Sequence, residues 1–345
     1  MLAPRLLKEV GELDTRNSRA KNFIYIFITT MKLILPVELA PNIEPLLPAN
    51  ITFVRVDSEG NFDGDPSGAE VYLNGFKLKN TTLHKVLAAA PTIRWQHTPS
   101  AGVNHILTPT FLEHDIVLTN GSGVHAIPIA EFVLNFILYH AKKVRKLEDL
   151  QANHHWFNWL ELEELYDKTL LIIGAGNIGQ EIAVRAKAFG MRIWGSRRHP
   201  QPLPNFHRIV GVDEWKTLLG EADYVVVATP LTPETKGLIN ADTLRLMRPS
   251  AYLINIARGA IVDEHALLTA LREGWIAGAG LDTFETEPLP SDSPFWSLPN
   301  VFVTPHCSAL TPQLRQRIVA LFLDNLTRYR HGQPLRNVVD KNAGY

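Results

Sequence analysis

Short apolar runs alternate with stretches of helical spacing along most of this chain. In the first third, β-rich runs predict strands at Lys32–Val37, Thr52–Asp57, Ala69–Leu73, Thr92–Thr98 and Asp115–Thr119. Helix-compatible stretches lie between several of them, notably Thr82–Ala89 and Val103–Phe111. Strands that alternate with helices are typical of a parallel, doubly wound sheet.

A second and more regular series follows. Its near-continuous apolar runs are of the kind buried on both faces of a sheet. They predict six strands, at Thr169–Ile173, Arg192–Gly195, Tyr224–Thr229, Ala251–Ala257, Ala279–Asp282 and Val301–Thr304. We therefore expect a second α/β domain with a nucleotide-type sheet.

Two helices flank this second series. His125–Lys143 has almost no polar stripe, and a helix that is apolar nearly all round is buried. It could lie between domains or in a subunit interface, and we favour the interface, which predicts a homodimer. The last helix, Pro312–His331, is expected to return the chain to the first domain.

The first thirty residues differ from the rest. Met1–Asn22 is charged and has no periodic apolar face, whereas Phe23–Thr30 is apolar. A signal peptide is an alternative, but Lys32 interrupts the apolar run and no small-residue cleavage site follows. We expect residues 1–30 to be an N-terminal extension, and we leave open whether the native protein carries it.

Composition narrows the class of protein. The chain has 345 residues, 46% of them hydrophobic, which predicts a soluble protein of about two domains. The formal charge of −1 favours neither nucleic acid nor an anionic membrane as a partner, so we expect a small molecule. A single cysteine, Cys307, excludes an intramolecular disulfide and fits a cytoplasmic location. We expect no metal site.

A glycine fingerprint follows the first strand of the second series. Gly174, Gly176 and Gly179 form Gly-x-Gly-x-x-Gly between that strand and an amphipathic helix. The first glycine permits a tight turn, the second lets the backbone approach a pyrophosphate, and the third allows close helix packing. With a strand before and a helix after, the pattern predicts dinucleotide binding.

The end of the next strand indicates which dinucleotide is used. Enzymes that select NAD usually place an acid there to hold the ribose hydroxyls. Here Ser196, Arg197 and Arg198 follow, with no acid before Asp213. Arginines can bind a 2′-phosphate, so the sequence favours NADPH, with NAD as the alternative.

Three residues supply the groups that reduction of a 2-oxo acid requires, and each follows a predicted parallel strand. Arg258 can hold the carboxylate and polarise the ketone through its planar fork. His306 can deliver the proton, and Glu287 can hold the other imidazole nitrogen and favour the protonated ring. Ligands collect outside the carboxyl ends of such strands, so the three side chains can converge.

On these and other ordered motifs the chain resembles the D-isomer-specific 2-hydroxyacid dehydrogenase family, which includes glyoxylate/hydroxypyruvate reductases and phosphoglycerate dehydrogenases. The match extends from about Met31 to Tyr345. Its further motifs are Ser100-Ala101-Gly102-Val103-Asn104, His125-Ala126-Ile127-Pro128-Ile129-Ala130-Glu131, Thr229-Pro230-Leu231-Thr232-Pro233-Glu234-Thr235, Gly280-Leu281-Asp282-Thr283-Phe284-Glu285-Thr286-Glu287-Pro288 and Arg336-Asn337-Val338-Val339-Asp340.

The resemblance implies a Rossmann dinucleotide-binding domain, residues 125–311, inserted into a flavodoxin-like substrate-binding domain, residues 31–124 and 312–345. It implies catalytic roles for Arg258, Glu287 and His306. The loop of Ala101, Gly102 and Val103 would bind the substrate together with Arg258. Gly102 and Val103 would do so through their backbone amides. Further cofactor contacts are implied at Asn177, Ile178, Thr229, Pro230, Ala257 and Asp282.

The expected function is reduction of glyoxylate, hydroxypyruvate or a similar small 2-oxo acid to the D-2-hydroxy acid. Two alternatives stay open. One is a phosphoglycerate-type dehydrogenase, and the other is a dinucleotide-sensing corepressor, because binding proteins share this fold. Neither the physiological substrate nor the direction of the reaction follows from the sequence.

Overall fold

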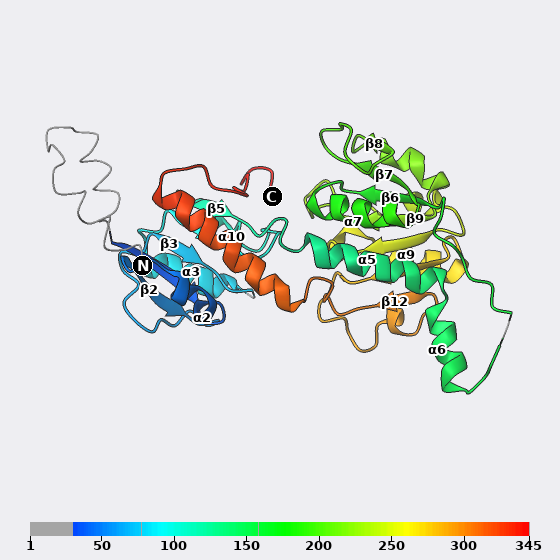
Figure 1. Cartoon of the computed structure of the whole chain (residues 1–345), viewed down its shortest axis with the longest axis horizontal. Helices are drawn as coiled ribbons and strands as arrows, with labels where there is room; N and C mark the ends of the chain where they lie inside the picture. Colours follow the sequence, from blue (N-terminus) through cyan, green and yellow to red (C-terminus); the bar gives the residue numbers. More distant parts are fainter. Residues whose placement is uncertain (1–29, 77, 158, 345) are drawn as a thin grey trace, which may run out of the picture. The chain divides into compact units, whose positions relative to one another are not determined.

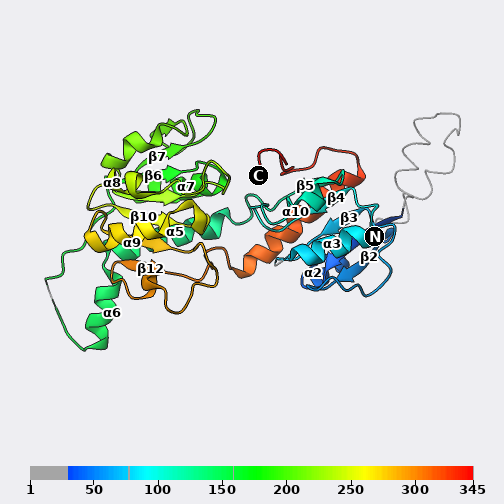
Figure 2. The same cartoon turned by 180° about the vertical axis from the view of Figure 1, so that it is seen from behind.

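A computed structural model describes residues 30–76, 78–157 and 159–344. Of the predicted N-terminal extension, residues 1–30, only Thr30 falls within this description. The described chain divides into two units, shown from two sides in Figures 1 and 2. Unit 1 comprises residues 30–99, His105–Asn120 and Ile318–Val339, and unit 2 comprises Ser100–Asn104, Gly121–Arg317 and residues 340–344.

Unit 1 is built on a five-stranded sheet with the order β2-β1-β3-β4-β5, and all neighbouring strands are parallel. This 2-1-3-4-5 order is the flavodoxin-like one and confirms the fold expected for this unit. The elements are β1 (Met31–Pro36), α2 (Ala40–Ile43), the 3₁₀ helix η2 (Glu44–Leu46), β2 (Ile51–Val56), β3 (Val71–Leu73), α3 (Asn80–Ala89), β4 (Trp95–His97), α4 (Pro109–Leu112) and β5 (Val117–Thr119).

The C-terminal helix α10 (Pro312–Arg330) closes the core of unit 1 through its residues from Ile318 onward. Trp95, which is fully buried, stacks on Phe322 and Tyr329 of this helix, with ring centroids 5.5 and 5.3 Å apart. Stacked aromatic pairs at such distances stabilise a core beyond the area they bury. The last helix therefore completes the core of unit 1.

One predicted helix of this half is wrong. Residues 103–108 are not helical, and α4 begins only at Pro109. The residue before a proline is disfavoured in the helical region, and Thr108 accordingly has extended dihedrals (φ −79°, ψ 158°). Its side chain instead caps α4 by accepting a hydrogen bond from the Phe111 amide.

Unit 2 contains a seven-stranded parallel sheet with the order β12-β11-β10-β9-β6-β7-β8. The six expected strands are present, and the short β8 adds a seventh that the sequence did not predict. Six strands, from β8 to β11, follow the Rossmann order 3-2-1-4-5-6, which confirms the predicted fold. The strands are β6 (Thr169–Ile173), β7 (Arg192–Ser196), β8 (Arg208–Val210), β9 (Tyr224–Val227), β10 (Tyr252–Asn255), β11 (Gly278–Leu281) and β12 (Val301–Val303).

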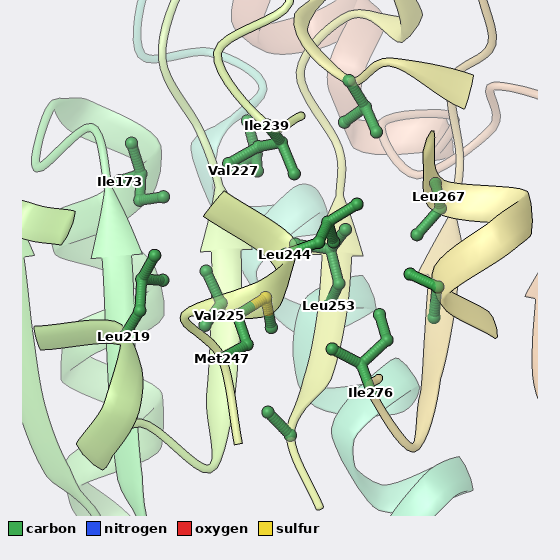
Figure 3. Packing of buried hydrophobic residues seen from close by; sticks show 14 of the residues in the cluster. Ile173, Leu219, Val225, Val227, Ile239, Leu244, Met247, Leu253, Leu267 and Ile276 are labelled. Carbon is green, nitrogen blue, oxygen red and sulfur yellow. The ribbon is translucent and has the colours of Figure 1, made fainter. Parts of the chain in front are cut away.

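Helices cover both faces of this sheet, because successive side chains of each buried strand point to opposite faces. On one face Ile173, Val225 and Leu253 pack under η3, α8 and α9 in the cluster of Figure 3. On the other face Leu170, Val226 and Ile254 pack under α5 and α7. The helices are α5 (Ala126–Ala141), α6 (Val144–Ala152), α7 (Asn177–Ala188), the 3₁₀ helices η3 (Trp215–Glu221), η4 (Gly259–Ile261) and η5 (Pro294–Trp296), α8 (Ala241–Arg245) and α9 (Glu264–Glu273).

The apolar helix predicted at His125–Lys143 is α5, and it is buried as expected. Its buried residues include Val133, Phe136 and Ile137, which pack within unit 2 against α7 and the sheet. The apolar pattern is therefore explained inside the domain and does not by itself indicate a subunit interface. None of the described helices combines the length and hydropathy needed to cross a membrane.

Candidate active site

The three predicted catalytic residues follow three strands that are neighbours in the sheet. Arg258 comes shortly after β10, Glu287 follows β11, and His306 follows β12. These strands pair in parallel in the order β12-β11-β10. Their carboxyl ends therefore lie at one edge of the sheet, where ligands of doubly wound folds bind.

Glu287 and His306 form a hydrogen-bonded pair. The Glu287 Oε2 atom lies 2.8 Å from His306 Nδ1, and Glu287 Oε1 accepts a hydrogen bond from the Phe284 amide at 3.0 Å. Both side chains are partly solvent-exposed, at 45% for His306 and 36% for Glu287. Because the carboxylate engages Nδ1, the imidazole presents Nε2 for proton transfer.

The backbone around His306 is held in an uncommon conformation. His306 has a φ of 51°, in the left-handed region that few residues other than glycine adopt. The fully buried Asp282 fixes this loop: its Oδ1 accepts hydrogen bonds from the Thr304 hydroxyl (2.6 Å) and the Cys307 amide (2.9 Å), and its Oδ2 from the Ser308 amide (3.1 Å). Such over-determined contacts maintain local strain at functional sites.

This arrangement adds to what the sequence indicated for Asp282. The resemblance implied a contact with the cofactor, whereas the structure uses both carboxylate oxygens to position the histidine loop. Three donors satisfy a carboxylate that would otherwise be costly to bury. No sequence signal showed this, because the donors lie more than twenty residues away along the chain.

Arg258 lies largely buried beside the predicted substrate loop. Burial lowers the pKa of its guanidinium, while the charge of Glu287 opposes that shift. Its Nη1 donates to the Ala257 carbonyl at 2.6 Å, and a Cβ at Gly102 would lie only 2.5 Å from Nη2. Ala101 and Val103 flank that glycine, and Val103 is buried. The structure thus brings together the loop and the arginine that the sequence assigned to substrate binding.

His125, which the sequence argument did not single out, also belongs to this neighbourhood. Burial lowers the pKa of His125 to about 4, a hydrogen bond to the Gly121 backbone raises it, and the charge of Arg258 lowers it. The Gly121 amide in turn donates to the carbonyl of Ser100, beside the substrate loop. A neutral imidazole therefore lies near the buried guanidinium.

The glycine fingerprint has the geometry expected of a pyrophosphate site. Gly174 follows β6 with a φ of +106°, and a Cβ there would lie 2.7 Å from the Thr229 amide nitrogen. A Cβ at Gly179 would lie 2.5 Å from the Gly174 carbonyl, whereas Gly176, before the first residue of α7, faces open space. The helix start has no side-chain cap, so its amides can bind an anion. These residues fit a dinucleotide.

The remaining predicted cofactor residues surround this turn. Asn177 and the partly buried Ile178 begin α7, and the Asn177 side-chain Nδ2 donates to the Ser122 hydroxyl at 3.0 Å. Thr229 and Pro230 follow β9, and Ala257 follows β10. All of them therefore lie at the carboxyl ends of strands in the same sheet, as Asp282 does.

The residues expected to select the cofactor lie at the end of β7 and directly after it. Ser196 ends β7 and is buried, and its carbonyl accepts the amides of Gly174 and Ala175. Arg197 is partly buried and Arg198 is exposed. A hydrogen bond from Thr232 lowers the pKa of Glu234, and the charge of Arg198 contributes to that shift. Arg198 and Glu234, in the loop after β9, thus interact electrostatically.

Comparison with known proteins agrees with this geometry. Residues 134–308 match the model of the D-isomer specific 2-hydroxyacid dehydrogenase NAD-binding domain. A glyoxylate reductase of Korarchaeum cryptofilum is 35% identical over 268 residues, which cover 75% of this chain and 80% of that protein. The match therefore includes most of both chains.

Solved structures give the same assignment. A D-isomer specific 2-hydroxyacid dehydrogenase of Xanthobacter autotrophicus, in complex with NADPH and MES, has a TM-score of 0.81 at 29% identity, covering 92% of this chain and all of that one. An NADPH-dependent glyoxylate/hydroxypyruvate reductase of Sinorhizobium meliloti, in complex with NADP and sulfate, has a TM-score of 0.79 at 28% identity with the same coverage. The chain belongs to the D-isomer specific 2-hydroxyacid dehydrogenase family.

Proposed function

We propose that this protein reduces a small 2-oxo acid of the glyoxylate or hydroxypyruvate type to the D-2-hydroxy acid. The observation that carries the proposal is the hydrogen-bonded Glu287–His306 pair. The two residues follow the neighbouring strands β11 and β12, and β11 lies beside β10, the strand that precedes Arg258. Together these side chains supply an anion-binding group, a proton donor and a carboxylate that orients the donor. The named activities of the similar glyoxylate reductases support the same reaction.

Arg258 binds the substrate. Its guanidinium can engage the carboxylate and the keto oxygen together, and it stays charged even where burial lowers its pKa. Because Gly102 approaches the guanidinium closely, a carboxylate bound by Arg258 can also accept hydrogen bonds from the backbone amides of this loop. The carboxylate and the keto oxygen of the substrate are thereby oriented.

His306 transfers the proton. When bound, the reduced dinucleotide supplies the hydride that adds to the carbonyl carbon. His306 Nε2 donates a proton to the resulting alkoxide oxygen, and Glu287 stabilises the imidazolium before that transfer. In the reverse direction the neutral imidazole accepts the proton from the hydroxyl group.

NADPH is the proposed cofactor. The chain places Ser196, Arg197 and Arg198 where NAD-selective loops carry an acid, and charge-assisted bonds from arginine suit a 2′-phosphate. The neighbouring structures in complex with NADPH or NADP support this preference. We assign residues 125–311 to the dinucleotide and residues 31–124 and 312–345 to the substrate-binding domain. The predicted homodimer can be tested by light scattering.

Initial rates of dinucleotide oxidation test this function. Glyoxylate, hydroxypyruvate, pyruvate and a branched 2-oxo acid are each combined with NADPH and with NADH, and the product of hydroxypyruvate is analysed for chirality. We expect turnover of the smaller acids, a higher kcat/KM with NADPH, and the D product. Absence of turnover with every combination of 2-oxo acid and dinucleotide, despite tight dinucleotide binding, would contradict the proposed activity. It would favour a dinucleotide-sensing role.

A further inference from the structure

The loop that carries Glu287 is held by a residue that is not one of the three proposed catalytic residues. This loop, residues 283–287, follows β11 and contains two successive backbone amides that donate to carboxylates. The Phe284 amide donates to Glu287 itself, and the Glu285 amide donates to Glu264 Oε1 at 2.7 Å. Glu264 is the first residue of α9, twenty-one positions earlier in the chain.

The same stretch of backbone rests against the residue after Arg258. A Cβ added at Gly259 would overlap the carbonyl carbon of Phe284 and the amide nitrogen of Glu285. One side of this peptide group is therefore packed on the Arg258–Gly259 backbone, while its N–H is bound by Glu264. Loss of the Glu264 contact would leave this N–H without its acceptor, in the loop that carries Glu287.

Helix α9 is a firm support for this contact. Asp263 caps it by accepting a hydrogen bond from the Ala266 amide, and Gly274 ends it in the left-handed conformation. Ala266, Leu267, Ala270 and Leu271 anchor the helix in the core of unit 2. A carboxylate on its first turn is thus held in place by the packed part of the domain.

The surroundings of Glu264 disfavour its charged form, and the hydrogen bond from the Glu285 amide opposes that effect. Burial raises the pKa of Glu264, the bond from the Glu285 amide lowers it, and the charges of Glu285 and Glu287 raise it. Burial and two acidic neighbours therefore oppose an ionised group at this place. A glutamine could accept the same hydrogen bond without that opposition.

We propose that Glu264 is a positioning residue for the Glu287–His306 pair, acting through the Glu285 amide. This inference rests on the proposed 2-oxo acid reduction. Glu264 does not contact the substrate. It sets the path of the loop, so that the Glu287 carboxylate meets His306 Nδ1. The contact works through acceptance of a hydrogen bond rather than through charge.

Four variants test the proposal. Glu264→Ala removes the acceptor, Glu264→Gln keeps it without the charge, and Glu264→Asp keeps the charge but withdraws it from the amide. Asp263→Ala is the matched control, because it removes the cap of the same helix without changing the Glu264 side chain. Each is measured for kcat with a 2-oxo acid, for dinucleotide affinity, and for hydrogen exchange in peptides covering residues 283–287.

We expect kcat to fall about ten-fold or more in Glu264→Ala and several-fold in Glu264→Asp, with unchanged dinucleotide affinity. Exchange at residue 285 should quicken in both. Glu264→Gln and Asp263→Ala should stay within about three-fold of the wild-type kcat and keep its protection. If Glu264→Ala does not fold, the comparison of Asp with Gln decides.

Wild-type kcat and protection in both Glu264→Ala and Glu264→Asp would overturn the proposal. An equal loss of kcat in Asp263→Ala would also overturn it, because helix stability would then explain the effect. A wild-type protein that turns over no 2-oxo acid would instead refute the proposed function. In that case hydrogen exchange alone would still decide whether Glu264 positions the loop.

Discussion

Replacement of Gly102 by alanine should misplace Arg258 without unfolding the protein. The new Cβ would lie 2.5 Å from Arg258 Nη2, whereas ordinary contacts of such atoms begin at 3.4 Å. The guanidinium or the loop must therefore move by about 1 Å, and a displacement of that size can cost about a hundred-fold in rate. Gly102 does not have a positive φ, so alanine introduces no backbone strain there.

The assay separates this effect from a general loss of structure. Steady-state kinetics with glyoxylate or hydroxypyruvate should show kcat/KM reduced about a hundred-fold. Dinucleotide affinity and the melting temperature should stay near wild type, because the displaced atom is the end of a flexible side chain. Gly220→Ala is the control, since its nearest new contact is 3.7 Å away. A Gly102→Ala enzyme within about three-fold of wild type would refute the proposed contact between loop and guanidinium.

Three further outcomes follow from the described contacts. Asp282→Asn, which leaves at least one donor of the histidine loop poorly satisfied, should lower the free energy of unfolding by about 2 kcal/mol and also lower kcat. Arg197→Ala should lower kcat/KM for NADPH about ten-fold or more and leave the value for NADH unchanged. Burial lowers the pKa of His97 to about 3, so the stability due to its neutral form is present above pH 6.5 and lost as the pH falls toward 3. Wild type should therefore lose about 2 kcal/mol more than His97→Gln between pH 7 and pH 5 in urea unfolding.

Each of these has a contrary result. An Asp282→Asn protein with unchanged stability would mean that the loop does not depend on this carboxylate. Equal losses with NADPH and NADH in Arg197→Ala would remove the 2′-phosphate argument. Parallel pH dependence in wild type and His97→Gln would show that His97 does not titrate differently in the folded and unfolded states.

The sequence predicted the features that depend on local patterns and on the geometry of parallel sheets. Buried strands are continuous apolar runs, so β6, β9 and β10 could be located with nearby boundaries. Because parallel strands share a carboxyl edge, the residues after them could be expected to meet, and Glu287 and His306 do so. The glycine fingerprint could also be interpreted from the sequence, because each of its glycines has a known steric role.

Features that depend on tertiary packing could not be predicted. The short strand β8 joins the sheet by pairing with β7. Its three residues are too few to show a strand pattern in the sequence. The contacts of Asp282 with the histidine loop and of Glu264 with the Glu285 amide join residues more than twenty positions apart. The apolar helix α5 suggested a subunit interface, but most of its apolar residues, including Val133, Phe136 and Ile137, are buried against α7 and the sheet.

The most direct test of the account is His306→Ala with two measurements on one preparation, dinucleotide affinity and turnover of the best 2-oxo acid. We expect unchanged affinity, because His306 is not part of the glycine turn. We expect turnover to fall about a hundred-fold or more, the usual contribution of a general acid. Near-wild-type turnover in this variant would contradict the assignment of His306 as the proton donor.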